Sequence, residues 1–449
     1  MTPKFALLSI TLSLLTLRAS AAGTVQSLAV EPAWAGHPVG FCLLTHAPFQ
    51  FVAYYDAQRR MSVAQRSLES TNWTITKLPS TVGWDSHNSI AMTLDRAGLL
   101  HVTGNMHCVP LVYFRSEKPL DAASLQRVEA MVGDRETRMT YPVFLRDRAG
   151  RLIFRYRNGR SGSGDDLYNV YDEKTRSWSC LIDQPLTSGR GRMNAYCSVP
   201  TSGPDGRFHM VWVWRDTPDC ASNHDISYAR SDDLVHWTDS TGHPLALPIT
   251  VETGEIVDPV PPGGGLINMN RELGFDNAGR PVVTYHKYDA QGDLQIYAAR
   301  HQSNAWKIVQ TSDWKGYRWN FSGGGSIVAE VRIGAVRPLG AGQLALNYHY
   351  PRGSGVWVLD EQTLAPIPGA TLPRAESLLP PLFAKVDSSF PGLKKQIRSD
   401  AGEAPPGRRF ALTWETLEAN RDRPHDPPLP APSMLRVIEV PTGSGAKAN

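Results

Sequence analysis

The chain has 449 residues, a formal net charge of +3, 41% hydrophobic and 20% charged residues. These values are typical of a globular protein, and the small net charge gives no indication of a nucleic-acid partner. Past the N-terminal region no stretch approaches the ~20 apolar residues of a membrane-spanning helix, so we expect no membrane insertion. The 38 Gly, 34 Pro, 12 Trp and 15 Tyr favour a mainly β protein with many turns.

The first residues have the features of a secretory signal peptide. Lys4 supplies a positive charge, an apolar run follows, and Ala19-Ser20-Ala21 resembles a cleavage site. We therefore expect residues 1–22 to be removed and the mature protein to be periplasmic or secreted.

Cysteines give little further guidance. In an exported protein some are expected to pair, and an odd number leaves at least one free or bound to a metal. Buried cysteines with at most one disulfide are the interpretation that we favour. The five residues are Cys42, Cys108, Cys180, Cys197 and Cys220.

A glycine turn followed by an apolar strand recurs along the chain. It appears in Asp95-Arg-Ala-Gly98, Asp147-Arg-Ala-Gly150 and Asp276-Asn-Ala-Gly279, with related turns at Gly206 and Gly342. After most of these turns comes an alternating strand that ends in Arg or Asp, and a Trp often follows it. Examples of this Trp are Trp178, Trp237 and Trp306.

Each repeat holds about four short strands in roughly 50–70 residues, which is typical of a β-propeller blade. The sequence therefore predicts an all-β, seven-bladed β-propeller with four-stranded antiparallel blades over residues 23–441. Residues 409–414 and 434–440 are predicted to complete the last blade, and residues 442–449 to form a disordered tail.

Polar residues cluster just before the glycine turns, on what we take as the innermost strand of each blade. Because such positions encircle the axis of a propeller, we expect them to share one mouth of the central channel. These residues are His87, Asn88, Tyr141, Asn194, Tyr196 and Asn270. The exits of the following strands, and one loop, add His107, Arg157, Arg215, Lys287 and His224.

This set is rich in cationic and phenolic side chains and poor in carboxylates. A glycosidase normally needs two Asp or Glu residues flanking the bond, and no such pair is evident. Cations suit an anionic sugar, and β-elimination on a uronic acid needs a cation on the carboxylate, a base for the C5 proton and an acid for the leaving oxygen. The hairpin over residues 139–159 predicts that Tyr141 and Arg157 share one end.

Each residue also has a structural interpretation. His87 fits a strand cap, Tyr141 an inner-strand aromatic, Arg157 a salt bridge between blades, and His224 an Asp–His turn with Asp225. Their recurrence at one end of the ring favours a site.

Several segments resemble the BNR-repeat family that includes seven-bladed propeller ulvan lyases. The resemblance extends over roughly residues 50–350. The segments are Asp85-Ser-His87-Asn88, Thr140-Tyr141-Pro142, Arg157-Asn-Gly-Arg-Ser-Gly162, Asn194-Ala-Tyr196 and Asn223-His224-Asp225.

The resemblance implies cleavage of a sulfated, uronate-containing polysaccharide by β-elimination. It implies that Arg157 and His224 neutralise the uronate and that Tyr141 is the general acid. It leaves open whether Tyr141 is also the base or whether His87 is the base or a partner. No cofactor is required for this chemistry. Some relatives hold a structural metal, for which Cys108 with His107, or Cys197, are candidates here.

The expected partner is an anionic polysaccharide, bound by a monomer. A sialidase-like glycoside hydrolase and a non-catalytic glycan-binding propeller are the alternatives.

Overall fold

The computed structural model describes residues 24–373 and 379–442. This part of the chain is built from strands, with three short 3-10 helices, so the all-β prediction is confirmed. The signal peptide predicted over residues 1–22 and the predicted tail, apart from Thr442, lie outside the described residues. No described helix has the length and apolar character needed to cross a membrane. The 3-10 helices are η1 (Ala122–Ser124), η2 (Cys220–Ser222) and η3 (Pro381–Ala384).

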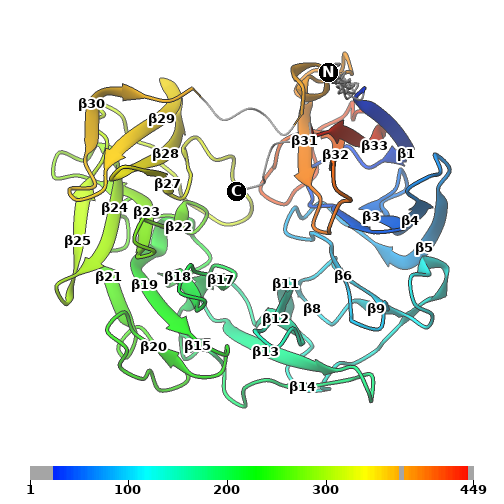
Figure 1. Ribbon diagram of the computed structural model, residues 1–449, viewed down its shortest axis with the longest axis horizontal. Coiled ribbons are helices and arrows are strands. Elements are labelled where there is room, and N and C mark those ends of the chain that lie inside the picture. The colour runs from blue at the N-terminus through cyan, green and yellow to red at the C-terminus, as the bar shows by residue number, and fades with distance from the viewer. Residues whose placement is uncertain (1–23, 374–378, 443–449) are drawn as a thin grey trace, which may run out of the picture.

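The described strands form seven antiparallel sheets, which follow one another around a common centre (Figure 1). The first sheet contains β2 (Cys42–His46), β3 (Phe49–Tyr55), β4 (Arg60–Ser67) and β5 (Thr74–Thr81). The second contains β6 (Ala91–Leu94), β7 (Leu100–Thr103), β9 (Tyr113–Ser116) and β10 (Leu125–Arg127).

The third and fourth sheets have six strands each. The third contains β8 (His107–Val109), β11 (Met139–Arg146), β12 (Leu152–Asn158), β13 (Asp165–Asp172), β14 (Ser177–Cys180) and β15 (Thr187–Ser188). The fourth contains β16 (Asn194–Cys197), β17 (Thr201–Ser202), β18 (Phe208–Arg215), β19 (Asn223–Ser231), β20 (Trp237–Thr238) and β21 (Glu255–Asp258).

The remaining sheets come from the second half of the chain. The fifth contains β22 (Arg271–Phe275), β23 (Pro281–Tyr288), β24 (Leu294–Gln302) and β25 (Ala305–Gln310). The sixth contains β26 (Arg332–Ile333), β27 (Arg337–Gly340), β28 (Gln343–Tyr350), β29 (Gly353–Asp360) and β30 (Pro366–Thr371). The seventh contains β31 (Lys394–Ser399), β32 (Arg408–Thr416), β33 (Ser433–Pro441) and β1 (Gln26–Ala33).

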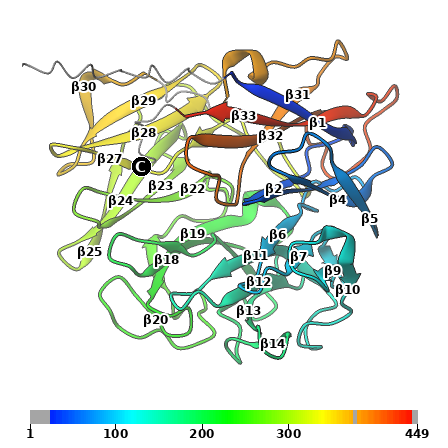
Figure 2. The same ribbon diagram turned by 45° about the vertical axis from the view of Figure 1, so that its right-hand side comes forward.

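The seventh sheet joins the two ends of the described chain. Strand β1 pairs with β33, with Gln26 opposite Glu439, and Figure 2 shows β1 beside the C-terminal strands. The two segments predicted to complete the last repeat lie in β32 and β33, as expected. Closure of the sheet therefore couples residues from opposite ends of the sequence.

The recurring glycine turns have one local cause. In each, an Asp carboxylate accepts a hydrogen bond from the backbone N–H four residues later, and the glycine between them has a positive φ, which a residue with a Cβ adopts only at a cost. The pairs are Asp95 with Leu99 at 2.8 Å, Asp147 with Arg151 at 2.8 Å, and Asp276 with Arg280 at 2.9 Å. Gly98, Gly150 and Gly279 have φ of 81°, 74° and 76°.

Aromatic side chains fill the space between neighbouring sheets. Phe41 stacks on Trp414 with ring centroids 4.4 Å apart, which links the first sheet to the seventh. Trp178 and Trp237, which belong to the recurring pattern in the sequence, are both buried. Truncating a buried aromatic of this kind typically costs about 3–5 kcal/mol. All five cysteines lie in the described part of the chain; none is paired, and Cys197 and Cys220 are buried.

Candidate active site

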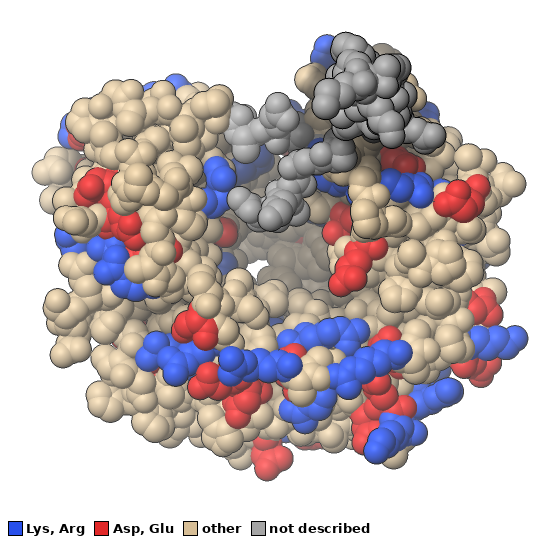
Figure 3. Space-filling view, viewed as in Figure 1, with Lys and Arg blue, Asp and Glu red and all other residues tan. Residues whose placement is uncertain are grey.

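A cavity of about 900 Å³ opens among the second to sixth sheets. Figure 3 shows a hollow at the centre of one face, with Lys and Arg side chains gathered over the sheets below it in this view. Seven of the eleven predicted site residues line the cavity. They are His87, His107, Tyr141, Arg157, Asn194, Tyr196 and Arg215.

Tyr141 reaches the cavity from a bulge in β11. Thr140 lies opposite Arg157 and Val143 opposite Arg155, so β11 has one residue more than β12 between these pairs. Tyr141 has a φ of 56°, which is unfavourable for an aromatic residue, and strained residues of this kind cluster at active sites. The bulge re-aims the side chain, as bulges next to active sites often do.

Arg157 lies against Tyr141, as the hairpin predicted. Its Cζ is 4.9 Å from the centroid of the Tyr141 ring, and the residue is only 4% exposed. Nη2 donates a hydrogen bond to Thr140 Oγ1 at 3.1 Å, but Nε and Nη1 have no hydrogen-bond partner. Gly164 leaves room for the side chain, because an added Cβ would lie 2.7 Å from Arg157 Cδ.

No carboxylate in the described part of the chain pairs with Arg157, so the salt bridge considered for it from the sequence is absent. Arg155, two residues earlier on the same strand, makes such a bridge instead, with Nε 2.8 Å from Asp166 Oδ1. A buried guanidinium without a counter-ion is costly unless a ligand supplies the negative charge. Arg157 is therefore suited to bind an anion in the cavity.

Aromatic rings and a second arginine surround this position. Arg215 lies 5.3 Å from the centroid of the Tyr196 ring and has no carboxylate partner among the described residues. The Tyr196 hydroxyl is 2.6 Å from that of Ser161, and Asn194 Oδ1 accepts a hydrogen bond from the N–H of Gly162 at 2.8 Å. Asn194 and Tyr196 therefore position the loop that follows Arg157.

The protonation state of Tyr141 follows from this environment. Burial raises the pKa of the phenol to about 12, and Tyr196 adds to the rise, whereas Arg157 and Arg215 oppose it. The phenol is therefore neutral near pH 7 and able to donate a proton.

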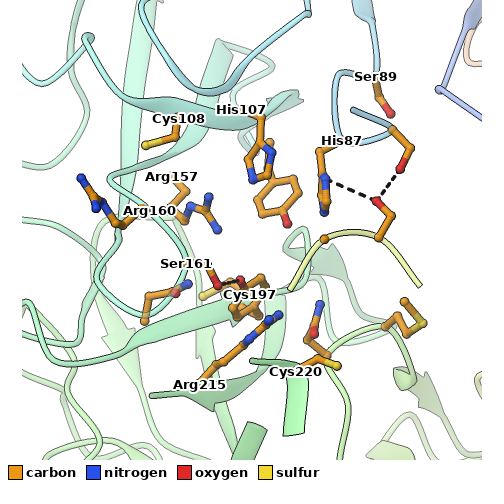
Figure 4. A pocket seen from close by; sticks show the side chains of 18 of the residues that line it. His87, Ser89, His107, Cys108, Arg157, Arg160, Ser161, Cys197, Arg215 and Cys220 are labelled. Atoms are coloured by element: carbon orange, nitrogen blue, oxygen red, sulfur yellow. Dashed lines mark hydrogen bonds between the residues drawn. The ribbon is translucent and has the colours of Figure 1, made fainter. Parts of the chain in front are cut away.

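His87 and His107 form another part of the cavity wall (Figure 4). Their ring centroids are 4.3 Å apart, and both rings face Asp85. His87 Nδ1 is 2.7 Å from Asp85 Oδ1 and 3.4 Å from Asp422 Oδ2, and His107 Nδ1 contacts Asp85 Oδ2. Burial acts to lower the pKa of His87, but Asp422 and Asp85 outweigh it and raise this pKa to about 9.

The strand placement expected for His87 was wrong, because this residue lies in the loop before β6. The loop is held by Asp85, whose Oδ1 accepts a hydrogen bond from the N–H of His87 at 2.9 Å. Asn270 also precedes its strand, β22, rather than lying on it.

Four predicted site residues are absent from the cavity wall. His224 lies between Asp225 and Asp216, with a ring nitrogen 3.0 Å from each, which is the Asp–His arrangement considered as the structural alternative. Lys287 Nζ is 2.5 Å from Asp258 Oδ2, so its charge is already balanced. Asn270 donates to Val331 O at 2.7 Å, and Asn88 lines a neighbouring cavity.

Several lining residues were missed by the sequence analysis. Arg155, Arg160 and Ser161 lie on the same hairpin and loop as Arg157, and their proximity to it in the sequence was the available signal. Asp422 contacts His87 from the segment between β32 and β33, and nothing in the sequence connects the two. Cys108 and Cys197 belong to no group of possible metal ligands among the described residues.

A sequence profile of BNR repeat-containing family members matches residues 49–314. The chain belongs to the BNR repeat-containing family. The matched segment holds the cavity residues from His87 to Arg271, whereas Ser326 and Asp422 lie beyond it. A comparison with curated proteins finds no match.

Three solved structures resemble this BNR-repeat protein over most of its length. Polysaccharide lyase Uly1 has a TM-score of 0.57 at 13% identity, with 92% of each chain covered. A PL25 ulvan lyase has a TM-score of 0.57, and its complex with -[GlcA(1-4)Rha3S]- one of 0.56. Both are 13% identical and cover 92% of this chain and 95% of theirs. At this identity the likeness shows a shared fold.

Proposed function

We propose that this protein is an exported seven-bladed β-propeller enzyme that cleaves a uronate-containing, sulfated, ulvan-like polysaccharide by β-elimination. Each of the seven sheets would be one blade. The observation that carries the proposal is Arg157, a buried guanidinium with two unpartnered nitrogen atoms, Nε and Nη1, beside a neutral tyrosine. The fold likeness to polysaccharide lyases, one of them in complex with a glucuronate-containing oligosaccharide, supports it.

In the proposed reaction the uronate carboxylate binds Arg157, with Arg215 close by. A charge-assisted hydrogen bond of this kind stabilises the enolate that develops when the C5 proton is removed. The C5–H bond and the C4–O4 bond break, a C4=C5 double bond forms, and O4 leaves with a proton. Tyr141 supplies this proton, because its phenol is neutral and lies beside the guanidinium.

Removal of the C5 proton is assigned to the side of the cavity that carries His87 and His107. An imidazole must be neutral to accept a proton, so His87 serves as the base only in its deprotonated form. The two rings lie 5.9 Å and 6.5 Å from the Tyr141 ring, centroid to centroid, so acid and base would act on one bound sugar. The proposal gives His224 no direct contact with the uronate.

A glycoside hydrolase is less compatible with this cavity. Retaining and inverting enzymes place two carboxyl groups about 5–10 Å apart across the bond. Asp166 is the one carboxylate among the described residues that line the cavity, and it is bound to Arg155.

One assay tests the proposal. The mature protein is incubated with ulvan and with non-sulfated uronate polymers, and the ultraviolet absorbance of the unsaturated uronate product is followed. We expect absorbance and new reducing ends to rise together. Reducing ends without absorbance would identify a hydrolase, and binding without either product would identify a glycan-binding protein; both results would overturn the proposal.

A further inference from the structure

Four possible metal ligands meet beside the cavity from three separate segments. Asp85 and His87 come from the loop before β6, His107 from β8, and Asp422 from the segment between β32 and β33. One ligand atom from each residue lies within 4.8 Å of those of the other three. Two imidazoles and two carboxylates in this space are the ligand number and type of a tetrahedral metal centre.

Hydrogen bonds fix the ligands in place. Asp422 Oδ1 accepts a hydrogen bond from Ser326 Oγ at 2.7 Å, and the N–H of Ser326 donates to Asp422 Oδ2 at 3.2 Å. The side chains of the four residues are between 15% and 26% exposed, so they are neither free in solvent nor sealed in the core. Outer contacts of this kind orient metal ligands and raise affinity.

Two residues of the group also line a second cavity. It has a volume of about 460 Å³, and its wall includes Asp85, His107 and Asn88. Asn88 is 8% exposed, and its Oδ1 is buried without a hydrogen-bond partner. A buried carbonyl oxygen is normally satisfied, so this unpartnered oxygen is unusual, and it belongs to a residue that shares the cavity wall with two of the ligands.

We propose that Asp85, His87, His107 and Asp422 form a binding site for one divalent transition-metal ion of the zinc class. Imidazole ligands favour Zn²⁺ and its neighbours in the transition series, whereas Ca²⁺ takes six to eight oxygen ligands and Mg²⁺ an octahedral oxygen shell. Bound metal links the segment between β32 and β33 of the seventh sheet to the loop before the second sheet. It therefore stabilises the folded protein.

The site also bears on the proposed reaction, and this part of the inference rests on the proposed function. His87 and His107 line both the substrate cavity and the metal group. Nδ1 of each ring faces Asp85, and when that nitrogen binds a metal ion the other nitrogen of the neutral ring carries the N–H, so the ring cannot accept a proton. Zn²⁺ is therefore expected to slow β-elimination, and a chelator to restore it.

Metal binding is measured directly on the full mature protein, without any activity assay. After chelator treatment and dialysis, we expect isothermal titration with Zn²⁺ to show one equivalent bound, and a rise in melting temperature. Co²⁺ should give the visible d–d absorption of a tetrahedral site. Ca²⁺ at the same concentration should bind far more weakly.

Variants locate the site. Asp422→Asn and His107→Gln should each weaken Zn²⁺ binding at least tenfold. Losing a residue that only contacts a metal ligand already costs about tenfold or more, and these variants remove a ligand itself. His236→Gln is the matched control, because His236 pairs with Asp233 on the surface at 2.8 Å and has no further ligand nearby; it should bind Zn²⁺ normally. Circular dichroism checks that each variant is folded.

Two results would overturn the metal site: Zn²⁺ uptake well below one equivalent, or uptake unaffected by both ligand variants. Either would show that the group is only a hydrogen-bonded ion pair. If one equivalent binds but turnover on ulvan is unchanged, the metal site stands and the inhibitory role is wrong. If ulvan is not cleaved at all, the proposed function fails while the binding result remains valid.

Discussion

Two parts of the cavity wall differ in whether a carboxylate lies against their basic side chains. His87 and His107 lie against Asp85, and Asp422 adds a further carboxylate, so the imidazoles are balanced within the protein. Arg157 has aromatic rings and a threonine hydroxyl around it, and no carboxylate of a described residue forms an ion pair with it, since Asp166 on the next strand is bound to Arg155. His87 and His107 therefore need no further anion beside them, whereas Arg157 is suited to bind the anion of the proposed substrate.

Arg155 and Arg157 lie on the same strand, but only Arg155 has a carboxylate partner among the described residues. Arg155 and Arg157 are 6% and 4% exposed on the same strand, β12. Burial acts to lower the pKa of Arg155, but the Asp166 carboxylate outweighs it and raises this pKa. Arg155 thus stabilises the hairpin, and Arg157 is left for a ligand.

The sharpest test exchanges each arginine for methionine. Arg155→Met leaves Asp166 buried without its partner and should reduce the free energy of unfolding by about 3–5 kcal/mol. Arg157→Met removes an unbalanced charge and should leave stability unchanged or higher, while turnover falls on the order of a hundredfold. Chemical denaturation and the ultraviolet assay measure the two effects. Equal losses of stability would refute the distinction between the two residues.

Tyr141 lies between the histidines and Arg157. Its substitution tests whether the phenol donates the proton to the leaving oxygen. Tyr141→Phe should lower turnover by roughly a thousandfold, or about 4 kcal/mol, because the phenol hydroxyl supplies the proton. Its melting temperature should change little, since the hydroxyl has no partner that the fold requires.

Tyr156→Phe is the matched control on the same hairpin. Tyr156 is buried on β12 and does not line the cavity, so turnover should stay near that of the unmodified protein. A Tyr141→Phe enzyme with normal turnover would remove this residue from the mechanism.

His286 is a third kind of buried basic residue. It has no carboxylate partner in the described part of the chain, and its imidazole is neutral near pH 7. Burial lowers the pKa of His286 to about 4. Nδ1 lies 2.7 Å from Gly265 O and Nε2 3.0 Å from the Asn270 amide nitrogen, which fits the neutral ring. Because the folded-state pKa lies below the ordinary 6.5, this stabilisation is present above pH 6.5 and is lost as the pH falls towards 4.

The expected loss is about 3 kcal/mol over that interval, from a pKa difference of about 2.5. Thermal melts between pH 4 and pH 7 measure it, and His286→Gln should show a flatter pH profile. His37, whose pKa is also lowered to about 4 by burial, should keep its own contribution in that variant. An identical profile for the two proteins would contradict this role of His286.

The smallest effect is expected where charges are exposed. Arg148 and Arg207 lie 3.4 Å and 3.2 Å from Asp232 on the surface. Asp232→Asn should change the free energy of unfolding by less than about 1 kcal/mol, since water and salt screen such pairs. A loss as large as that of Arg155→Met would show that burial is not what separates the two kinds of ion pair.

The sequence by itself determined the strands, the turns and the main hairpin. Asp and Gly at fixed spacing specify each turn through bonds within five residues, and Tyr141 meets Arg157 because a hairpin brings them together. Local patterns of this kind are visible in a single sequence because their partners lie close along the chain.

Only the tertiary structure decided which charges are balanced. Lys287 is neutralised by Asp258 from another strand, while Arg157 makes no ion pair with any described residue, because Asp166 opposite it is paired with Arg155. Ser86 and Asp422 meet across 336 residues, beside His87. The energy of a buried charge depends on what surrounds it in space, and that environment is assembled from sheets distant in sequence.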